Sequence, residues 1–126
     1  MSETGITPAY LDEIFDAFNE RDLEKIAGYF AEDGVFQAPL GPPPYGNRAV
    51  GKQQIKDFLS QRWARIPTMR WKDQTASIVG NTATTAWKVL WTDENGTENE
   101  WAGCDLYVFE GRKIKLKDTY WKRLAT

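Results

Sequence analysis

The residues best suited to chemistry lie near the end of the chain, between Cys104 and Lys122. Apolar and polar side chains alternate through this stretch on both sides of Glu110-Gly111-Arg112, which predicts a β-hairpin. If those three residues form the loop, Asp105 lies directly opposite Lys117. A carboxylate beside an ammonium can accept or donate a proton, and the surroundings of the pair decide which. The hairpin therefore carries the candidate catalytic pair, Asp105 and Lys117.

The same hairpin could form with a second register. A two-residue turn at Gly111-Arg112 would place Asp105 opposite Asp118, and like charges directly opposite each other are destabilising. The three-residue loop avoids this repulsion, and it also places Trp101 opposite Trp121. We therefore expect the three-residue loop.

The charged face of the hairpin is either exposed to solvent or the lining of a pocket. On the first interpretation the alternate aliphatic residues form the core, and the Asp105–Lys117 pair is an exposed ion pair worth only ~0.2 to 1 kcal/mol. That arrangement would also expose a cluster of aromatic side chains, which soluble proteins rarely do without a partner. We therefore expect the charged face to line a pocket and the aliphatic face to contact a second subunit in a homodimer. The aliphatic face is Cys104, Leu106, Val108, Ile114 and Leu116.

Several further side chains would surround the pair in such a pocket. Tyr107 and Thr119 share its face and could orient a substrate oxygen. Tryptophans suit a flat hydrophobic ligand, although large aromatic side chains are more often part of a core. The other lining candidates from the strands are Trp87, Val89, Trp91, Trp101 and Trp121.

The composition excludes several classes of mechanism. The 126 residues contain no histidine and one cysteine, so Ser-His-Asp and Cys-His catalysis, intrachain disulfides and ordinary zinc sites cannot form. We therefore expect no metal and no cofactor. The net charge of -2, with acids and bases interspersed, favours neither nucleic acid nor a membrane as a partner. Because no leader or membrane-spanning segment is evident, we expect a soluble, cytoplasmic protein.

Periodicity predicts the elements that position these residues. In order, they are a helix that begins at Pro8, a helix capped by Asp22 and ended by Gly34, a strand at Val35–Ala38, a Pro/Gly-rich loop, a helix at Lys52–Arg65, and four antiparallel strands from Met69 onward. The order α-α-β-α-β-β-β-β in a single domain of residues 1–126 predicts an α+β, cone-shaped fold. In this fold three N-terminal helices pack on a strongly curved, mostly antiparallel sheet.

Three segments of the chain are distinctive. They are YFAEDGVFQAPLG at Tyr29–Gly41, the helix start at Gly51–Leu59, and DLYVFEGRKIKLKDTYW at Asp105–Trp121. Together they resemble the SnoaL-like branch of the nuclear transport factor 2 superfamily. The resemblance implies the ketosteroid isomerase-like fold, which hosts isomerases, hydrolases, dehydratases, cyclases and non-enzymatic adaptors.

The ketosteroid isomerases of that superfamily allow a comparison position by position. The position of their general base is occupied here by Ala38, and the position of their oxyanion-hole tyrosine is occupied by Ile14. Both functional groups are therefore absent. The protonated aspartate of that oxyanion hole falls at Asp105. Ile14 and Ala38, with Phe18 and Phe58 from the helices, complete the predicted lining of the pocket.

These observations favour one function and leave two alternatives open. We expect a cofactor-independent isomerase or lyase that transfers a proton on a small hydrophobic molecule, aromatic or carbonyl-bearing, although Ala38 disfavours ordinary ketosteroid isomerisation. The first alternative is a non-catalytic, dimeric small-molecule-binding protein or adaptor that uses the same cavity. The second is a structural dimerisation domain, in which Trp87, Trp91 and Trp121 fill the cavity.

Overall fold

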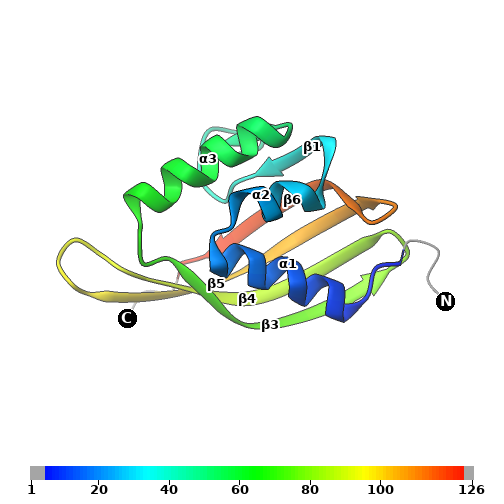
Figure 1. Cartoon of the computed structure of the whole chain (residues 1–126). Coiled ribbons are helices and arrows are strands. Elements are labelled where there is room, and N and C mark those ends of the chain that lie inside the picture. Colours follow the sequence, from blue (N-terminus) through cyan, green and yellow to red (C-terminus); the bar gives the residue numbers. More distant parts are fainter. Residues whose placement is uncertain (1–4, 124–126) are drawn as a thin grey trace.

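The computed structural model describes residues 5–123, in which three helices lie against one side of a six-stranded sheet (Figure 1). The elements in chain order are α1 (Pro8–Glu20), α2 (Leu23–Tyr29), β1 (Phe30–Gln37), β2 (Arg48–Val50), α3 (Lys52–Arg65), β3 (Arg70–Val79), β4 (Thr82–Thr92), β5 (Glu98–Glu110) and β6 (Lys113–Lys122). The predicted α+β order is confirmed with one addition, because the short strand β2 lies in the segment expected to be only loop. No helix in this part of the chain is long and apolar enough to cross a membrane.

The two N-terminal helices begin where the sequence predicts. Thr7 caps α1, since its Oγ1 accepts a hydrogen bond from the backbone N–H of Tyr10 at 3.1 Å, and Pro8 follows as the first helical residue. Asp22 caps α2 in the same way through the backbone N–H of Lys25. Both helices therefore start on local hydrogen bonds that the sequence alone indicates.

The predicted end of the second helix near Gly34 and the predicted strand start at Val35 are wrong. Helix α2 ends at Tyr29, and Phe30 already begins β1. Gly34 lies inside β1, where a Cβ atom would come within 2.7 Å of the carbonyl oxygen of Ile114 in β6. The glycine therefore allows the close approach of two strands and does not terminate a helix.

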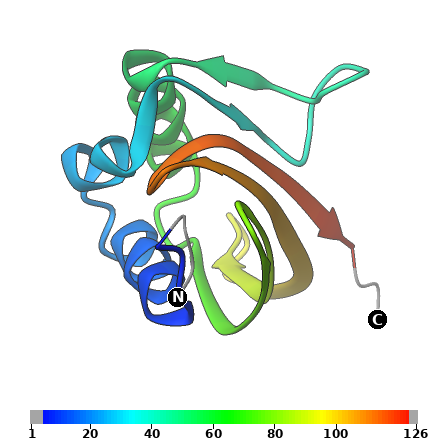
Figure 2. The same cartoon turned by 90° about the vertical axis from the view of Figure 1, so that its right-hand side faces the viewer.

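The sheet has the strand order β2-β1-β6-β5-β4-β3, and all neighbours are antiparallel except β1 and β6. It curves strongly around the side on which the helices lie (Figure 2). The core fills this concavity, with Leu11 and Ile14 from α1, Ile55 and Leu59 from α3, and Phe109 from β5 almost completely buried. The predicted cone-shaped fold is confirmed.

The β5–β6 hairpin differs in register from the prediction. Its turn holds two residues instead of three, and a β-bulge follows at Lys115 in β6. Beyond the bulge, Asp105 pairs with Thr119 and not with Lys117. The two-residue turn was disfavoured because it would set Asp118 opposite Asp105, and the bulge removes that repulsion by adding one residue to β6.

The bulge keeps the predicted face of the charged pair but changes the face of Ile114. Thr119, two residues beyond the predicted partner, takes the place opposite Asp105. Because side chains alternate with a period of two, a shift of two residues leaves Lys117 on the same concave face as Asp105. Ile114 precedes the bulge and is fully buried in the core, so its predicted place on the outer aliphatic face is wrong.

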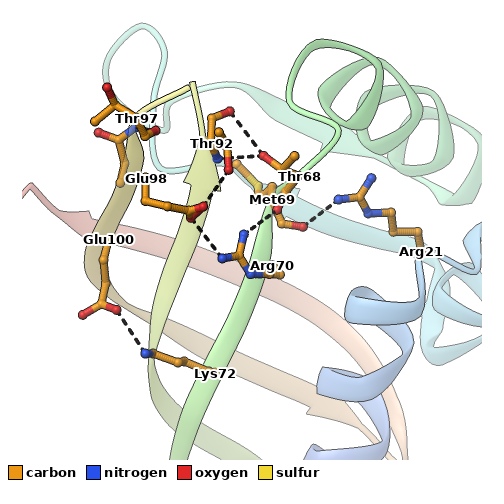
Figure 3. Close-up of polar contacts among 10 residues, drawn as sticks. Arg21, Thr68, Met69, Arg70, Lys72, Thr92, Thr97, Glu98 and Glu100 are labelled. Atoms are coloured by element: carbon orange, nitrogen blue, oxygen red, sulfur yellow. Dashed lines mark hydrogen bonds and ion pairs between the residues drawn. The ribbon is translucent and has the colours of Figure 1, made fainter. Parts of the chain in front are cut away.

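Polar contacts secure the edge where α3 passes into β3 (Figure 3). Arg21, at the end of α1, donates a hydrogen bond to the carbonyl of Met69 at 2.8 Å. Arg70 and the hydroxyl of Thr92 both donate to the carboxylate of Glu98, at 3.0 and 2.7 Å, and so join β3, β4 and β5. These contacts hold the buried Met69 side chain at one end of the sheet, where it packs with the tryptophans described below.

Candidate active site

The carboxylate of Asp105, on β5, is the centre of a buried hydrogen-bond cluster. Its Oδ1 accepts hydrogen bonds from Lys117 Nζ at 2.9 Å and from Thr119 Oγ1 at 2.5 Å. Its Oδ2 accepts one from Trp87 Nε1 at 2.9 Å, and the hydroxyl of Thr85 lies at 3.5 Å. These donors occupy the acceptor positions of the carboxylate. Asp105 is therefore held in one orientation.

Lys117 is the partner of Asp105 and is equally buried. Its side chain is 7% exposed, and its Nζ donates hydrogen bonds to Asp105 and, at 3.2 Å, to the hydroxyl of Thr119. An ammonium has three N–H bonds, so one is left for another acceptor. The rings of Phe36 and Phe18 lie 4.5 and 4.7 Å from the Nζ atom. Burial lowers the pKa of Lys117, and the adjacent Asp105 carboxylate opposes this effect.

The ring of Tyr107 lies beside the pair, with its centroid 5.9 Å from Lys117 Nζ. It lies opposite Lys117 across the hairpin and stacks on Phe109, with ring centroids 5.5 Å apart. Its hydroxyl makes no hydrogen bond to another residue between 5 and 123. Burial, with the nearby charge of Asp105, raises the pKa of Tyr107 well above its usual value, so the phenol stays protonated. Within the described part of the chain, Tyr107 is therefore a hydrogen-bond donor without a partner.

A cavity of about 20 Å³ lies beside this cluster. That volume holds about one water molecule, so a larger ligand requires the lining side chains to move. Asp105 and Lys117 line the cavity together with five predicted substrate-binding residues, which are Tyr107, Thr119, Trp121, Trp87 and Phe18. Four lining residues were not predicted as part of the site: Phe15, Arg62, Trp71 and Gln74. No group of three or more His, Cys, Asp or Glu side chains in the described part of the chain is placed to hold a metal ion.

Four of the other predicted residues lie outside the lining of this cavity. Ile14 and Val89 are fully buried in the core. Trp91 and Trp101 contact each other edge to face, with centroids 4.9 Å apart, and both pack against Trp121. Trp121 is a diagonal neighbour of Trp101 in the sheet, so their predicted direct pairing is wrong. The tryptophans form a cluster next to the cavity, and Trp121 also lines the cavity itself.

The remaining two predicted residues, Ala38 and Phe58, line a second and larger pocket. This outer pocket has a volume of about 140 Å³. Arg62 and Trp121 line both the outer pocket and the inner cavity. These two side chains therefore separate the cluster around Asp105 from the larger space.

Arg62 is the charged site residue that the sequence analysis missed. It lies on the buried side of α3, which consists of Ile55, Leu59, Arg62 and Trp63. The guanidinium of Arg62 lies over the ring of Phe58, 4.9 Å from its centroid. An arginine at a helical position that otherwise carries apolar side chains was the available signal.

The fold and the buried polar cluster define the class to which the protein belongs. Residues 11–116 match the SnoaL-like domain family, so the chain is a member of that family. Its fold is that of the nuclear transport factor 2 superfamily, as the three sequence segments predicted. No curated protein matches the chain.

Solved structures with this fold cover nearly the whole chain. A nuclear transport factor 2-like protein of unknown function from Burkholderia pseudomallei is 21% identical, with a TM-score of 0.82 over 97% of this chain and 92% of that one. A hypothetical protein with a ketosteroid isomerase-like fold from Catenulispora acidiphila, in complex with trimethylamine, is 18% identical, with a TM-score of 0.81 over 94% and 88%. A candidate polyketide cyclase from Xanthomonas campestris is 20% identical, with a TM-score of 0.74 over 90% and 88%. At these identities the likeness shows the fold.

Proposed function

We propose that the protein is a cofactor-independent isomerase or lyase that transfers a proton on a small hydrophobic, carbonyl-bearing molecule. The observation that carries this proposal is the buried Lys117–Asp105 pair, with 2.9 Å between Nζ and Oδ1, beside a cavity lined by aromatic rings. Ionisable groups perturbed by burial within a cavity are typical of proton-transfer sites. Fold relatives named as a candidate polyketide cyclase and a candidate isomerase support small-molecule chemistry of this kind.

We assign the proton transfer itself to Lys117. Burial lowers its pKa, which increases the fraction of Lys117 present as the neutral amine, and a neutral amine can remove a proton from a carbon next to a carbonyl. The phenol of Tyr107 donates a hydrogen bond to the carbonyl oxygen as negative charge develops there. Asp105 and Thr119 hold the Lys117 amine in place through their hydrogen bonds. Return of the proton to a different carbon completes an isomerisation, and departure of a leaving group completes an elimination.

Hydrogen–deuterium exchange tests this proposal without knowledge of the product. The protein is incubated in D2O with a panel of small cyclic and aromatic ketones, and NMR follows deuterium uptake next to the carbonyl. Lys117→Met and Tyr107→Phe should each slow the exchange about 100-fold or more. Lys115→Met is the matched control and should leave the rate unchanged, because Lys115 pairs with Asp33 at the surface. Exchange that persists in Lys117→Met would refute the assignment.

A non-catalytic binding protein or adaptor is the second candidate, and two positions favour it. The places of the ketosteroid isomerase base and tyrosine are taken by Ala38 and Ile14, which supply no functional group. A thermal-shift screen with steroids, lignin-type aromatics and polyketide fragments would find ligands under either hypothesis. Ligands with exchangeable protons that bind but take up no deuterium would favour the binding protein over the enzyme.

We also propose that the outer face of the sheet joins two copies of the chain in a homodimer. On this face Leu106 is 42% exposed and Tyr120 is 53% exposed, and the half-buried Cys104, Val108 and Leu116 lie on the same face. Apolar surfaces of this kind are usually covered by a partner. Sedimentation velocity should give twice the chain mass of 14.4 kDa, and Leu106→Glu should give the single mass. A wild-type protein that sediments as a monomer would contradict the proposal.

A further inference from the structure

Arg62 is a buried cation for which the described residues supply no ion-pair partner. The residue is 6% exposed, and its side chain forms no hydrogen bond or ion pair with any residue between 5 and 123. Its guanidinium lies near the rings of Phe58, Phe36 and Trp121, at 4.9, 5.6 and 5.7 Å from their centroids. Burial lowers the pKa of Arg62 to about 10, although the charge of Asp105 acts in the opposite direction. A buried charge in this state is costly unless another group pairs with it.

A second donor without a partner among the described residues belongs to Trp121, whose ring centroid lies 5.7 Å from the guanidinium carbon of Arg62. The Nε1 atom of Trp121 is buried and has no hydrogen-bond partner within the described chain. An indole N–H can only donate, and a guanidinium carries five donor N–H bonds and no acceptor. Two adjacent groups that can only donate leave a place for an acceptor. The planar fork of an arginine matches a carboxylate in shape and charge.

The charges around the inner cavity also favour an anion. Among the described residues that line it, the charged ones are Arg62, Lys117 and Asp105. Asp105 already forms an ion pair with Lys117 at 2.9 Å. The charge of Arg62 is therefore in excess, and a bound anion would neutralise it in a place with little water to do so.

The outer pocket indicates the size of the rest of the ligand. Its volume is about 140 Å³, and Arg62 and Trp121 lie at its boundary with the inner cavity. An apolar cavity of about 150 Å³ in another protein holds benzene, so this pocket has room for a single ring. Its apolar wall consists of Ala38, Pro39, Leu40, Phe58 and Ile66.

We propose that Arg62 and the Trp121 indole N–H bind the carboxylate of a small acid whose single ring occupies the outer pocket. That this ligand is the substrate rests on the proposed function, whereas its binding does not. If it is the substrate, the substrate is a monocyclic carboxylic acid that also bears the reactive carbonyl. A carboxylate held at the boundary between the two spaces leaves the ring in the outer pocket, so the substituent that bears the reactive carbonyl would extend past Arg62 and Trp121 toward Lys117.

Binding of unreactive probes tests this site separately from catalysis. Benzoate and its neutral analogue benzamide are titrated into the full chain by calorimetry. Benzoate should bind at least about tenfold more tightly, because a charge-assisted, bidentate contact to Arg62 is stronger than a neutral one. Arg62→Met should weaken benzoate binding about tenfold or more, and Trp121→Phe should weaken it by a smaller factor. Arg70→Gln is the matched control and should have no effect, since Arg70 pairs with Glu98 at the surface.

Three results would overturn the proposal. They are equal affinities for benzoate and benzamide, benzoate affinity unchanged by Arg62→Met, and no benzoate binding at millimolar concentration. Urea unfolding shows whether Arg62→Met folds. If this variant does not fold, the ratio of benzoate to benzamide affinity in the wild-type protein tests the proposal instead.

Tyr107→Phe separates the binding site from the proposed reaction. This variant should keep its affinity for benzoate and lose deuterium exchange, because the Tyr107 hydroxyl acts only on the carbonyl. Benzoate binding as expected, with no exchange on any ketone, would mean that the reaction is wrong and the carboxylate site is right. Deuterium exchange without a preference for benzoate over benzamide would mean that the reaction is right and the carboxylate site is wrong.

Discussion

Replacement of Lys117 by methionine should destabilise the protein strongly, because Asp105 then stays buried without its ammonium partner. The Asp105 side chain is 5% exposed. Of its hydrogen bonds of 2.9 Å or less, only those donated by Trp87 and Thr119 would remain in the variant. Removing one partner of a buried ion pair costs about 3–5 kcal/mol. Domains have a total free energy of unfolding of roughly 5–15 kcal/mol, so the loss is a large part of the whole.

A double-mutant cycle with Asp105→Asn isolates the ionic part of this effect. Asparagine has the shape of aspartate and can still accept a hydrogen bond, but it carries no charge that needs a partner. The double variant should therefore be more stable than Lys117→Met alone, by about 2 kcal/mol. Lys115→Met is the control in the same strand and should change stability little, because Lys115 and its partner Asp33 are at the surface.

Urea unfolding followed by tryptophan fluorescence measures all four variants. With a slope of about 1.5 kcal/mol per M, a loss of about 4 kcal/mol lowers the unfolding midpoint by about 2.7 M. A Lys117→Met variant as stable as the wild-type protein would refute the reasoning. So would a double variant no more stable than Lys117→Met, because the charge of Asp105 would then not be the source of the loss.

Three further predictions concern Lys117 and its surroundings. Gly103→Ala should displace the Trp87 ring, because a Cβ atom at position 103 would lie 2.5 Å from that ring. We expect the free energy of unfolding to fall by about 1–3 kcal/mol and the near-ultraviolet circular dichroism spectrum to change. An unchanged spectrum would contradict the close packing. The deuterium-exchange rate should rise with pH, because burial lowers the pKa of Lys117 and the neutral amine is the active form. Asp105→Asn removes the carboxylate that raises this pKa, so the profile should move to lower pH, and a profile that stays in place would count against Lys117 as the base. Since the folded state releases the Lys117 proton before the unfolded state does, stability should rise with pH up to the ordinary lysine pKa of about 10.4, and Lys117→Met should lose that rise.

Local signals were sufficient for most of the helices and strands. Helix α3 has its predicted bounds, Lys52–Arg65, and the caps at Thr7 and Asp22 are in place. Each of these features depends on side chains within a few residues of one another, so the sequence near it carries the information. The end of α2 was predicted wrongly because Gly34 meets Ile114, a residue far away in the chain.

The bulge at Lys115 is a feature that local pattern does not reveal. The run Lys113–Lys117 alternates without a break, so nothing in it marks an extra residue. The irregularity lies where β6 meets two neighbours at once, and the pairing of β1 with β6 also shifts there, between Phe30 and Val35. Register at such a point depends on how three strands fit together.

The sequence by itself determined that Asp105, Tyr107, Lys117 and Thr119 share one face of a hairpin. Side chains alternate with a period of two, so a register error of two residues beyond the bulge leaves these four side chains on the predicted face. Tertiary structure alone decided that Trp87 completes the cluster around Asp105, that the inner cavity is small, and that Arg62 has no hydrogen-bond or ion-pair partner among residues 5–123. Those properties depend on how a helix and distant strands pack against one another, and no spacing within a single segment encodes them.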